Sequence, residues 1–516
     1  MSERASRFCR HPSVLLAAIC LVAVAVRLHG IHLSLWFDEL CTYWSVDGGL
    51  SRITERSLST NHLPTFSYLV WLSVGCLGKS ELAIRLPSVL AGVLLVPAVF
   101  ATAKRITGSR GAALLAALLV ATDNLCIMFG ATAREYSFVQ LVSLLHIAAF
   151  WELISAPSGR RRLAFVATLV AMFYLHITSV VIVMGEIAFY AAMVCRRGKT
   201  PYRPTRFLSD LVVAGLLCTP VLPYVLAMAG KRHAMDVVLE HSFQLQDILI
   251  LYPVHVYIVY PLLAAGFVCF ALRSADAQPG ERPAGRAEAL AFLGCLFFVP
   301  SVVLWVVSRA GIAPLFHVWY TTPLIVLPIL ASALVWSWIP GRAGRVVFAL
   351  VAVGLMQASE GPVRRYLAGQ VSARLQKEDW KDAMAYLNAN DSDAALPLFI
   401  RAGFCETDDD LAHQPADGLA RRLLTEPFVC MYPLKHNQRP IRSLTFDGSL
   451  ADERQVTEIR RAGGAWFLVK TSPSRAERMA RRAIDRLRKQ GTELEQSDML
   501  AYEHVAVFRL REPSSR

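Results

Sequence analysis

The sequence predicts a polytopic α-helical membrane protein that ends in a small α/β domain. Of its 516 residues, 54% are hydrophobic and only 18% are charged, and the mean hydropathy is +0.42. A soluble protein carries about 25% charged residues. Apolar stretches of membrane-spanning length recur up to residue 360, and a polar segment follows. We therefore expect a transmembrane domain at 1–360 and an extracytoplasmic α/β domain at 361–516.

Eleven apolar stretches predict the membrane spans. They lie near residues 12–29, 83–103, 111–127, 136–154, 163–176, 177–195, 207–228, 246–272, 289–308, 320–338 and 346–359. The first stretch follows Arg4, Arg7 and Arg10, as in a signal peptide, but no small-x-small cleavage site comes after it. We interpret it as a retained signal anchor with the N-terminus in the cytoplasm.

The net charge of +13 predicts the orientation of these spans. Residues 361–516 hold 25 Lys/Arg and 22 Asp/Glu, so +10 of the net charge belongs to the membrane part. With the N-terminus inside, the cytoplasmic loops carry nineteen basic residues, and the opposite loops before the tail carry seven. This bias follows the positive-inside rule, places the tail in the periplasm of a bacterial inner membrane and argues against nucleic-acid binding.

One further apolar stretch, residues 64–78, is too short to be a span. Counting it would invert every later loop and place Arg160–Arg162 outside the cytoplasm. Apolar helices of this length lie more often at the membrane interface. We therefore expect a juxtamembrane helix inside a long first outer loop, residues 30–82.

The polar tail predicts alternating helices and strands. Helical patterns cover residues 379–388, 452–462 and 472–490, and β-rich runs cover 396–400, 466–470 and 504–510. Two of the eleven cysteines, Cys405 and Cys430, lie in this tail and are a disulfide candidate if it is outside the cytoplasm. The other nine lie in the membrane part, where cysteine behaves as a small apolar residue.

Two adjacent carboxylates, Asp38 and Glu39, stand just past the first span, where a membrane helix meets water. At that boundary the dielectric constant falls, and a nearby cation tunes the pKa of a carboxylate. A carboxylate there can take a proton from an attacking hydroxyl or hold a divalent metal. The other interpretation, that both are solvated interfacial acids, stays open.

Polar residues of the outer loops are candidates for binding a donor phosphate or a sugar. They are His62, Arg134, Glu135, Tyr136, Arg309, His317 and Tyr320. A helix N-terminus beside His62 would favour an anion, and an arginine between two spans suits a phosphate. Each residue also fits a structural role, as a helix cap, an Arg–Glu pair or a solvated loop residue. Arg85, near the outer end of the second span, is expected to snorkel to the interface.

Four short segments follow one another along the chain. They are Leu35-Trp36-Phe37-Asp38-Glu39, His62-Leu63-Pro64, Arg85-Leu86-Pro87-Ser88 and Ala133-Arg134-Glu135-Tyr136. In this order and spacing the chain resembles the GT-C glycosyltransferases, closest to the protein O-mannosyltransferases and the lipid A aminoarabinose transferases. The resemblance covers about residues 1–340, and Glu378-Asp379-Trp380-Lys381 in the tail also looks like bacterial members of this group.

That resemblance implies a GT-C-like fold of about eleven transmembrane helices plus juxtamembrane helices. It also implies transfer of a sugar from a polyprenyl-phosphate donor to a glycan, lipid or protein acceptor, with membrane lipids as further partners. By the same resemblance, Asp38 is the catalytic base, Glu39 is its partner and His62 lies near the donor phosphate. The one cofactor that the sequence suggests is a divalent metal held by Asp38 and Glu39.

The chain departs from the pattern of that group at three positions. Leu63 stands where the group has a proline, and Thr132 stands where it has a glutamate. Trp319 replaces an arginine that contacts the phosphate in relatives, so Arg309 or His317 would have to substitute.

Two other kinds of function stay open. A transporter or lipid flippase would need ionisable groups near the bilayer midplane, and Glu186 is the main acid within a span. A non-catalytic scaffold would use the tail to bind a partner in the cell envelope. Since no nucleotide-binding motif stands in a supporting context, a transfer reaction would draw its energy from an activated substrate.

Overall fold

The computed structural model describes residues 12–197, 200–230, 244–271, 285–368, 378–391, 396–403, 419–436, 439–445, 448–450, 452–502 and 504–513. The chain divides into two compact units. Unit 1 comprises Met1–Gly30 and Pro87–Ser372, and unit 2 comprises Ile31–Leu86 and Ala373–Arg516. Unit 2 therefore joins most of the first outer loop to the tail, whereas the predicted domains follow the chain.

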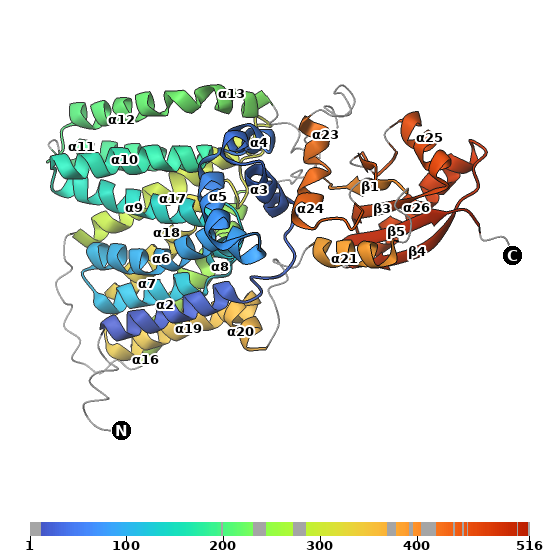
Figure 1. Ribbon diagram of the computed structural model, residues 1–516. Helices are drawn as coiled ribbons and strands as arrows, with labels where there is room; N and C mark the ends of the chain where they lie inside the picture. Colours follow the sequence, from blue (N-terminus) through green and yellow to red (C-terminus); the bar gives the residue numbers. More distant parts are fainter. Residues whose placement is uncertain are drawn as a thin grey trace. The chain divides into compact units, whose positions relative to one another are not determined.

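Unit 1 is a bundle of helices that run alongside one another (Figure 1). Its elements are α2 (Pro12–Leu28), most of α6 (Glu81–Thr107), α7 (Arg110–Thr122), α8 (Asn124–Gly130), α9 (Tyr136–Ser155), α10 (Gly159–Leu175), η2 (Ile177–Val181), α11 (Ile182–Arg197), α12 (Pro204–Cys218), η3 (Thr219–Val221), α13 (Leu222–Gly230), α15 (Asp247–Leu251), η5 (His255–Val259), α16 (Tyr260–Ala271), α17 (Gly285–Arg309), η6 (Thr322–Leu324), α18 (Val326–Trp338), α19 (Arg342–Glu360) and α20 (Pro362–Leu367). Each of the eleven predicted stretches falls on one of these helices or on a run of consecutive ones.

The apolar helices of unit 1 are broken more often than the sequence suggests. Among the described residues, five helices are long and apolar enough to cross a membrane, or six if α7 and α8 form one span bent by 60°. Two predicted spans are interrupted by short 3₁₀ or π segments, 207–228 by η3 and 246–272 by η5. A bundle of apolar helices is therefore present, and the count of eleven spans stays a prediction.

A buried arginine holds the bend between α7 and α8. The last carbonyls of a helix have no partner within it. Arg27 of α2 is fully buried and donates to the carbonyls of Val120 (3.3 Å) and Ala121 (3.2 Å). Asp123 caps α8 by accepting a hydrogen bond from the Cys126 backbone N–H at 2.8 Å. These contacts satisfy the backbone at the bend, so the kink has an identifiable cause.

Unit 2 contains the helices of the first outer loop and the α/β tail. Its elements are α3 (Phe37–Asp47), η1 (Leu50–Arg52), α4 (Ile53–Ser59), α5 (Thr65–Leu77), the start of α6, α21 (Trp380–Asn390), β1 (Leu398–Arg401), α23 (Leu419–Leu423), α24 (Glu426–Met431), β2 (Ile441–Ser443), α25 (Glu453–Ala462), β3 (Gly464–Lys470), α26 (Pro473–Arg488), β4 (Glu495–Ala501) and β5 (Val505–Arg511). Helix α5 coincides with the predicted juxtamembrane stretch 64–78, whose position at the interface stays a prediction.

The tail is built around a five-stranded mixed sheet with the strand order β2-β1-β3-β5-β4 (Figure 1). Strands β1, β2 and β3 are parallel, and β5 is antiparallel to both β3 and β4. One face carries stacked rings of Phe399, Phe467 and Phe508, which pack in a core that includes α25 and α26. Strands β1, β3 and β5 fall on the predicted β-rich runs. The edge strands β2 and β4 were not predicted, because they are short or polar and lack the β-rich pattern.

Candidate active site

Asp38 lies in the first turn of α3 in unit 2. The turn begins at Phe37, whose backbone N–H donates to Glu378 Oε2 at 2.7 Å. Asp38 is partly exposed, whereas Phe37 and Glu39 on either side of it are buried. Negative side chains are stabilised at a helix N-terminus by the helix dipole. The turn therefore suits an acidic side chain and leaves that of Asp38 partly exposed to solvent.

Glu39 has a different environment from its neighbour. Its side chain is 1% exposed, and Arg85 donates to both of its oxygens, Nε to Oε1 at 2.8 Å and Nη2 to Oε2 at 2.6 Å. Glu39 Oε2 also accepts a hydrogen bond from the Trp36 backbone N–H at 3.3 Å. Such a bidentate pair is strong and geometrically specific. Glu39 therefore fixes the start of α3.

Arg85 does not snorkel to the interface, so that expectation was wrong. Its side chain is 1% exposed and donates to the carbonyls of Ile31 (2.8 Å), Leu33 (2.8 Å) and Ser34 (3.0 Å) in addition to Glu39. A buried charge is tolerated only when it is paired and hydrogen-bonded. These acceptors lie in the segment before α3, so Arg85 joins α6 to the loop that carries the carboxylates.

Two tail residues, Glu378 and Lys470, adjoin the first turn of α3. Lys470 Nζ lies 2.6 Å from Glu378 Oε1. Burial lowers the pKa of Lys470, but Glu378 and Asp38 raise it more, so the pKa lies above the usual lysine value. The sequence offered one signal for Glu378, in the segment Glu378–Lys381, and none for Lys470 at the end of a strand.

His62 lies in the turn between α4 and α5 and is partly exposed. Its backbone N–H donates to the carbonyl of Ser57 at 3.0 Å, and Asn61 before it has a positive φ of 57°. Both α4 and α5 pack against α3. The structure thus places His62 and Asp38 in the same group of helices.

Arg134, Glu135 and Tyr136 form a buried cluster at the start of α9 in unit 1. Arg134 Nε lies 3.6 Å from Glu135 Oε2, with side chains 3% and 6% exposed. The Arg134 guanidinium also lies over the Tyr136 ring, 5.8 Å from its centroid. A buried arginine beside an aromatic face is a typical site for a phosphate or a sugar.

His176 connects this cluster to Tyr320. The His176 ring lies 6.1 Å from the ring of Tyr136 and 6.1 Å from the ring of Tyr320. His317 is in the same turn as Tyr320, because the Tyr320 backbone N–H donates to the His317 carbonyl at 3.0 Å. Arg309 is exposed in the last turn of α17, where a positive charge stabilises the helix dipole. The sequence had singled out all but His176 as candidates.

The structure bears on both the predicted metal site and the predicted disulfide. Both oxygens of Glu39 are occupied by Arg85, so Glu39 would have to leave that pair to bind a cation. Within the part of the chain that is described, no group of three or more His, Cys, Asp or Glu is placed to hold a metal ion. Cys405 lies outside the described residues. Burial, together with nearby Asp47, raises the pKa of the Cys430 thiol to about 12.

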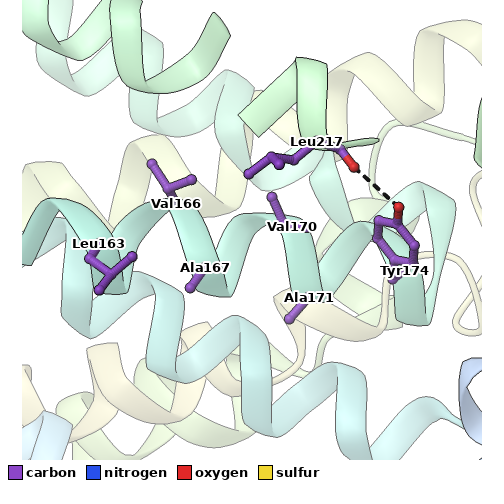
Figure 2. A pocket seen from close by; sticks show the side chains of 7 residues that line it. All are labelled: Leu163, Val166, Ala167, Val170, Ala171, Tyr174 and Leu217. Carbon is purple, nitrogen blue, oxygen red and sulfur yellow. Dashed lines mark hydrogen bonds between the residues drawn. The ribbon is translucent and has the colours of Figure 1, made fainter. Parts of the chain in front are cut away.

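An apolar hollow of about 430 Å³ lies on α10 of unit 1. Six side chains of α10 and Leu217 of α12 line it, and the Tyr174 hydroxyl donates to the Leu217 carbonyl at 3.1 Å (Figure 2). The lining suits a hydrocarbon chain and offers neither a base nor a cation for a phosphate.

Comparison with known proteins agrees with the resemblance identified from the sequence. Residues 61–224 match the family model of the dolichyl-phosphate-mannose-protein mannosyltransferases. The crystal structure of ArnT from Cupriavidus metallidurans bound to undecaprenyl phosphate is similar with a TM-score of 0.54 and 14% identity, over 96% of this chain and 97% of that one. The archaeal oligosaccharyltransferase AglB from Archaeoglobus fulgidus, in complex with an inhibitory peptide and a dolichol-phosphate, has a TM-score of 0.44 and 11% identity, over 88% and 69%. No curated protein sequence matches the chain.

The family match over residues 61–224 and the likeness to ArnT agree with the resemblance found in the sequence. At 14% identity the ArnT likeness concerns the fold, and it extends over nearly the whole chain. The family match includes His62, Arg85 and Arg134–Tyr136, while Asp38 and Glu39 lie before it.

Proposed function

We propose that this chain, which has a GT-C-type fold, is a membrane glycosyltransferase that moves a sugar from polyprenyl phosphate to an acceptor of the cell envelope. The observation that carries the proposal is the contrast between two adjacent carboxylates. Glu39 is buried and neutralised by Arg85, whereas Asp38 is partly exposed at the start of α3. Asp38 is therefore the group of the pair that a substrate can reach.

In this proposal Asp38 is the general base. It takes the proton from an acceptor hydroxyl or amine as that atom attacks the anomeric carbon of the donor sugar. The bond from this carbon to the phosphate oxygen breaks, and polyprenyl phosphate leaves with the bonding electrons. A single displacement of this kind inverts the anomeric configuration.

The leaving phosphate needs positive charge or hydrogen-bond donors around its oxygens. In unit 2, His62 is the candidate, in the turn before α5. In unit 1, Arg134 is the candidate, and Glu135 and Tyr136 hold its guanidinium in place. Tyr320 and His317 would contribute hydroxyl and imidazole donors, and Arg309 an exposed cation.

The orientation is also part of the proposal. The excess of basic residues in the predicted cytoplasmic loops supports a cytoplasmic N-terminus, a periplasmic tail and an inner-membrane location. The acceptor and donor would then meet on the periplasmic face.

Replacing Asp38 with Asn tests the proposal. The variant keeps the size of the side chain but cannot accept the proton, so the rate of sugar transfer should fall by about 10²–10⁴-fold. Undecaprenyl phosphate should still bind, as measured on the purified chain. The readout is mass spectrometry of envelope glycans in cells that lack the gene and express each variant.

The matched control is Asp47→Asn at the other end of α3, where Asp47 accepts a hydrogen bond from the Tyr43 hydroxyl. It should transfer sugar at nearly the parental rate. Parental transfer by Asp38→Asn would show that Asp38 is not the base. Glycans unchanged by loss of the whole chain would favour a scaffold.

One observation favours a transporter as the second candidate. His146 of α9 and Glu186 of α11 are fully buried and lie 3.2 Å apart, and His146 Nδ1 lies 2.9 Å from the Thr168 hydroxyl. Ionisable residues within membrane spans often mark ion or proton pathways. Labelled sugar that crosses vesicles without reaching an acceptor would support this candidate over transfer.

A further inference from the structure

The first turn of α3 is held by a carboxylate of the tail. Glu378 Oε2 accepts hydrogen bonds from the Phe37 backbone N–H and from the Trp380 indole N–H, both at 2.7 Å. Glu378 is 3% exposed, and the Phe37 ring stacks on Phe428 with centroids 5.6 Å apart. Because Phe37 directly precedes Asp38, the position of the Asp38 backbone depends on Glu378.

Lys470 in turn holds Glu378. Its Nζ lies 2.6 Å from Glu378 Oε1, the oxygen that does not bind Phe37. Lys470 ends β3, a central strand that pairs with β1 on one side and β5 on the other. A strand paired on both sides is a rigid support for a side chain. The ammonium group is therefore fixed relative to the start of α3.

Lys470 also interacts electrostatically with Asp38. The Asp38 carboxylate is one of the two charges that raise the pKa of Lys470 against its burial. The Lys470 side chain is 34% exposed and Asp38 is partly exposed, so neither group is sealed from solvent. The lysine thus pairs with the buried Glu378 carboxylate and adds a positive charge within electrostatic range of the more exposed Asp38.

We infer that Glu378 and Lys470 are a positioning pair, through which the α/β tail holds the Asp38 carboxylate in the geometry needed for sugar transfer. The inference rests on the proposed function and gives the tail a specific part in it. The pair acts through hydrogen bonds and charge on α3 and does not touch the reacting atoms. A misplacement of a reacting group by about 1 Å lowers a rate by roughly 10²-fold.

Three full-length variants test the pair: Lys470→Met, Lys470→Arg and Glu378→Gln. Lys470→Met removes the charge and keeps the aliphatic stem, so the rate of glycan formation in cells should fall by roughly 10–10²-fold. Lys470→Arg keeps the charge and should recover most of that rate. Glu378→Gln keeps an oxygen for the Phe37 N–H and removes the charge, so its rate should fall as in Lys470→Met.

The matched control is Lys489→Met, an exposed lysine just after α26, which should keep the parental rate. The melting temperature in detergent and the binding of undecaprenyl phosphate are measured for each variant. A positioning role predicts that binding is unchanged while the rate falls. It also predicts that the double variant Glu378→Gln/Lys470→Met is no slower than either single one, because the two residues act as a unit.

Two results would overturn the inference: a parental rate for Lys470→Met, or an equal loss of rate in Lys470→Arg and Lys470→Met with both folded. If Lys470→Met does not accumulate in cells, the rates of Lys470→Arg and Glu378→Gln are compared instead. The inference predicts a near-parental rate for Lys470→Arg and a reduced rate for Glu378→Gln, and equal rates in the two folded variants would overturn it. A parental rate for Asp38→Asn would instead remove the proposed function, and the two failures are thereby distinguished.

Discussion

Asp38 and Glu39 are adjacent in the chain, yet their surroundings separate them. Both oxygens of Glu39 accept hydrogen bonds from Arg85 inside the protein, whereas Asp38 remains partly exposed. Two neighbouring carboxylates can perform different roles when their environments differ. The structure thus gives one carboxylate a buried ion pair and leaves the other partly exposed.

Glu39→Gln should destabilise the protein because it leaves Arg85 buried without a counter-charge. Breaking a buried ion pair from one side costs about 3–5 kcal/mol. The expected result is a clearly lower melting temperature in detergent. The control is Glu55→Gln, whose pair with Arg52 is about half exposed and contributes at most about 1 kcal/mol. Equal melting temperatures for the two variants would contradict the structural role of Glu39.

Arg134→Ala should weaken the binding of undecaprenyl phosphate. Loss of a hydrogen bond to a charged group costs about 1.5–3 kcal/mol, or roughly 10–10²-fold in affinity. Isothermal titration or native mass spectrometry of the purified chain measures the change. Arg110→Ala, at the exposed start of α7, is the control and should bind as the parent does. Unchanged affinity in Arg134→Ala would remove Arg134 from the phosphate site.

At the scale of elements, the close approach of α6 and α8 depends on two glycines. A Cβ added at Gly92 would meet Arg27 Nε at 2.8 Å and the Gly130 Cα at 3.0 Å. A Cβ at Gly130 would meet Arg27 Nε at 2.7 Å. Arg27 cannot move away without losing its hydrogen bonds to the carbonyls of α7.

Gly92→Ala and Gly130→Ala should therefore lower the melting temperature. Gly215→Ala in α12 is the control, because nothing lies within 4 Å of its added Cβ. Alanine has a helix propensity better than that of glycine by about 1 kcal/mol, so the control should be as stable as the parent or more stable. A loss of stability in Gly215→Ala alone would contradict this account of the packing.

At the scale of the whole molecule, the tail and the first outer loop belong to one compact unit although they are far apart in the chain. Phe37 and Glu378 are 341 positions apart, and the Trp44 indole N–H donates to Glu426 Oε2 at 2.7 Å across 382 positions. The proposed orientation must therefore put both segments on the same side of the membrane.

Cysteine labelling of intact cells tests that orientation. In a chain with Cys76→Ser and Cys195→Ser, which removes the two exposed cysteines of the described residues, the variant Ser51→Cys should react with a membrane-impermeant thiol reagent. Arg160→Cys, in the basic first turn of α10, should react only after the cells are opened. Both positions are exposed on the protein, so access depends on the side of the membrane. The opposite pattern would place Asp38 in the cytoplasm and end the proposal.

Much of the fold was predictable because it depends on local pattern. Apolar stretches predicted the helices of unit 1, and the helix that ends at Gly463 was predicted within one residue. The bend between α7 and α8 was not predicted, because it depends on hydrogen bonds from Arg27 to the carbonyls of Val120 and Ala121, which are 93 and 94 positions away in the chain. At the candidate site, the individual residues could be predicted from the sequence, whereas the pairing of Glu39 with Arg85 could not.

The sequence alone determined that this is a helical membrane protein with two adjacent carboxylates just past its first apolar stretch, since hydropathy and charge act locally along the chain. Only the tertiary structure decided which carboxylate is neutralised and that the tail holds α3. The reason is physical: the energy of a buried charge depends on the partners that folding brings within hydrogen-bond distance. Those partners, Arg85 for Glu39 and Lys470 for Glu378, come from distant parts of the chain.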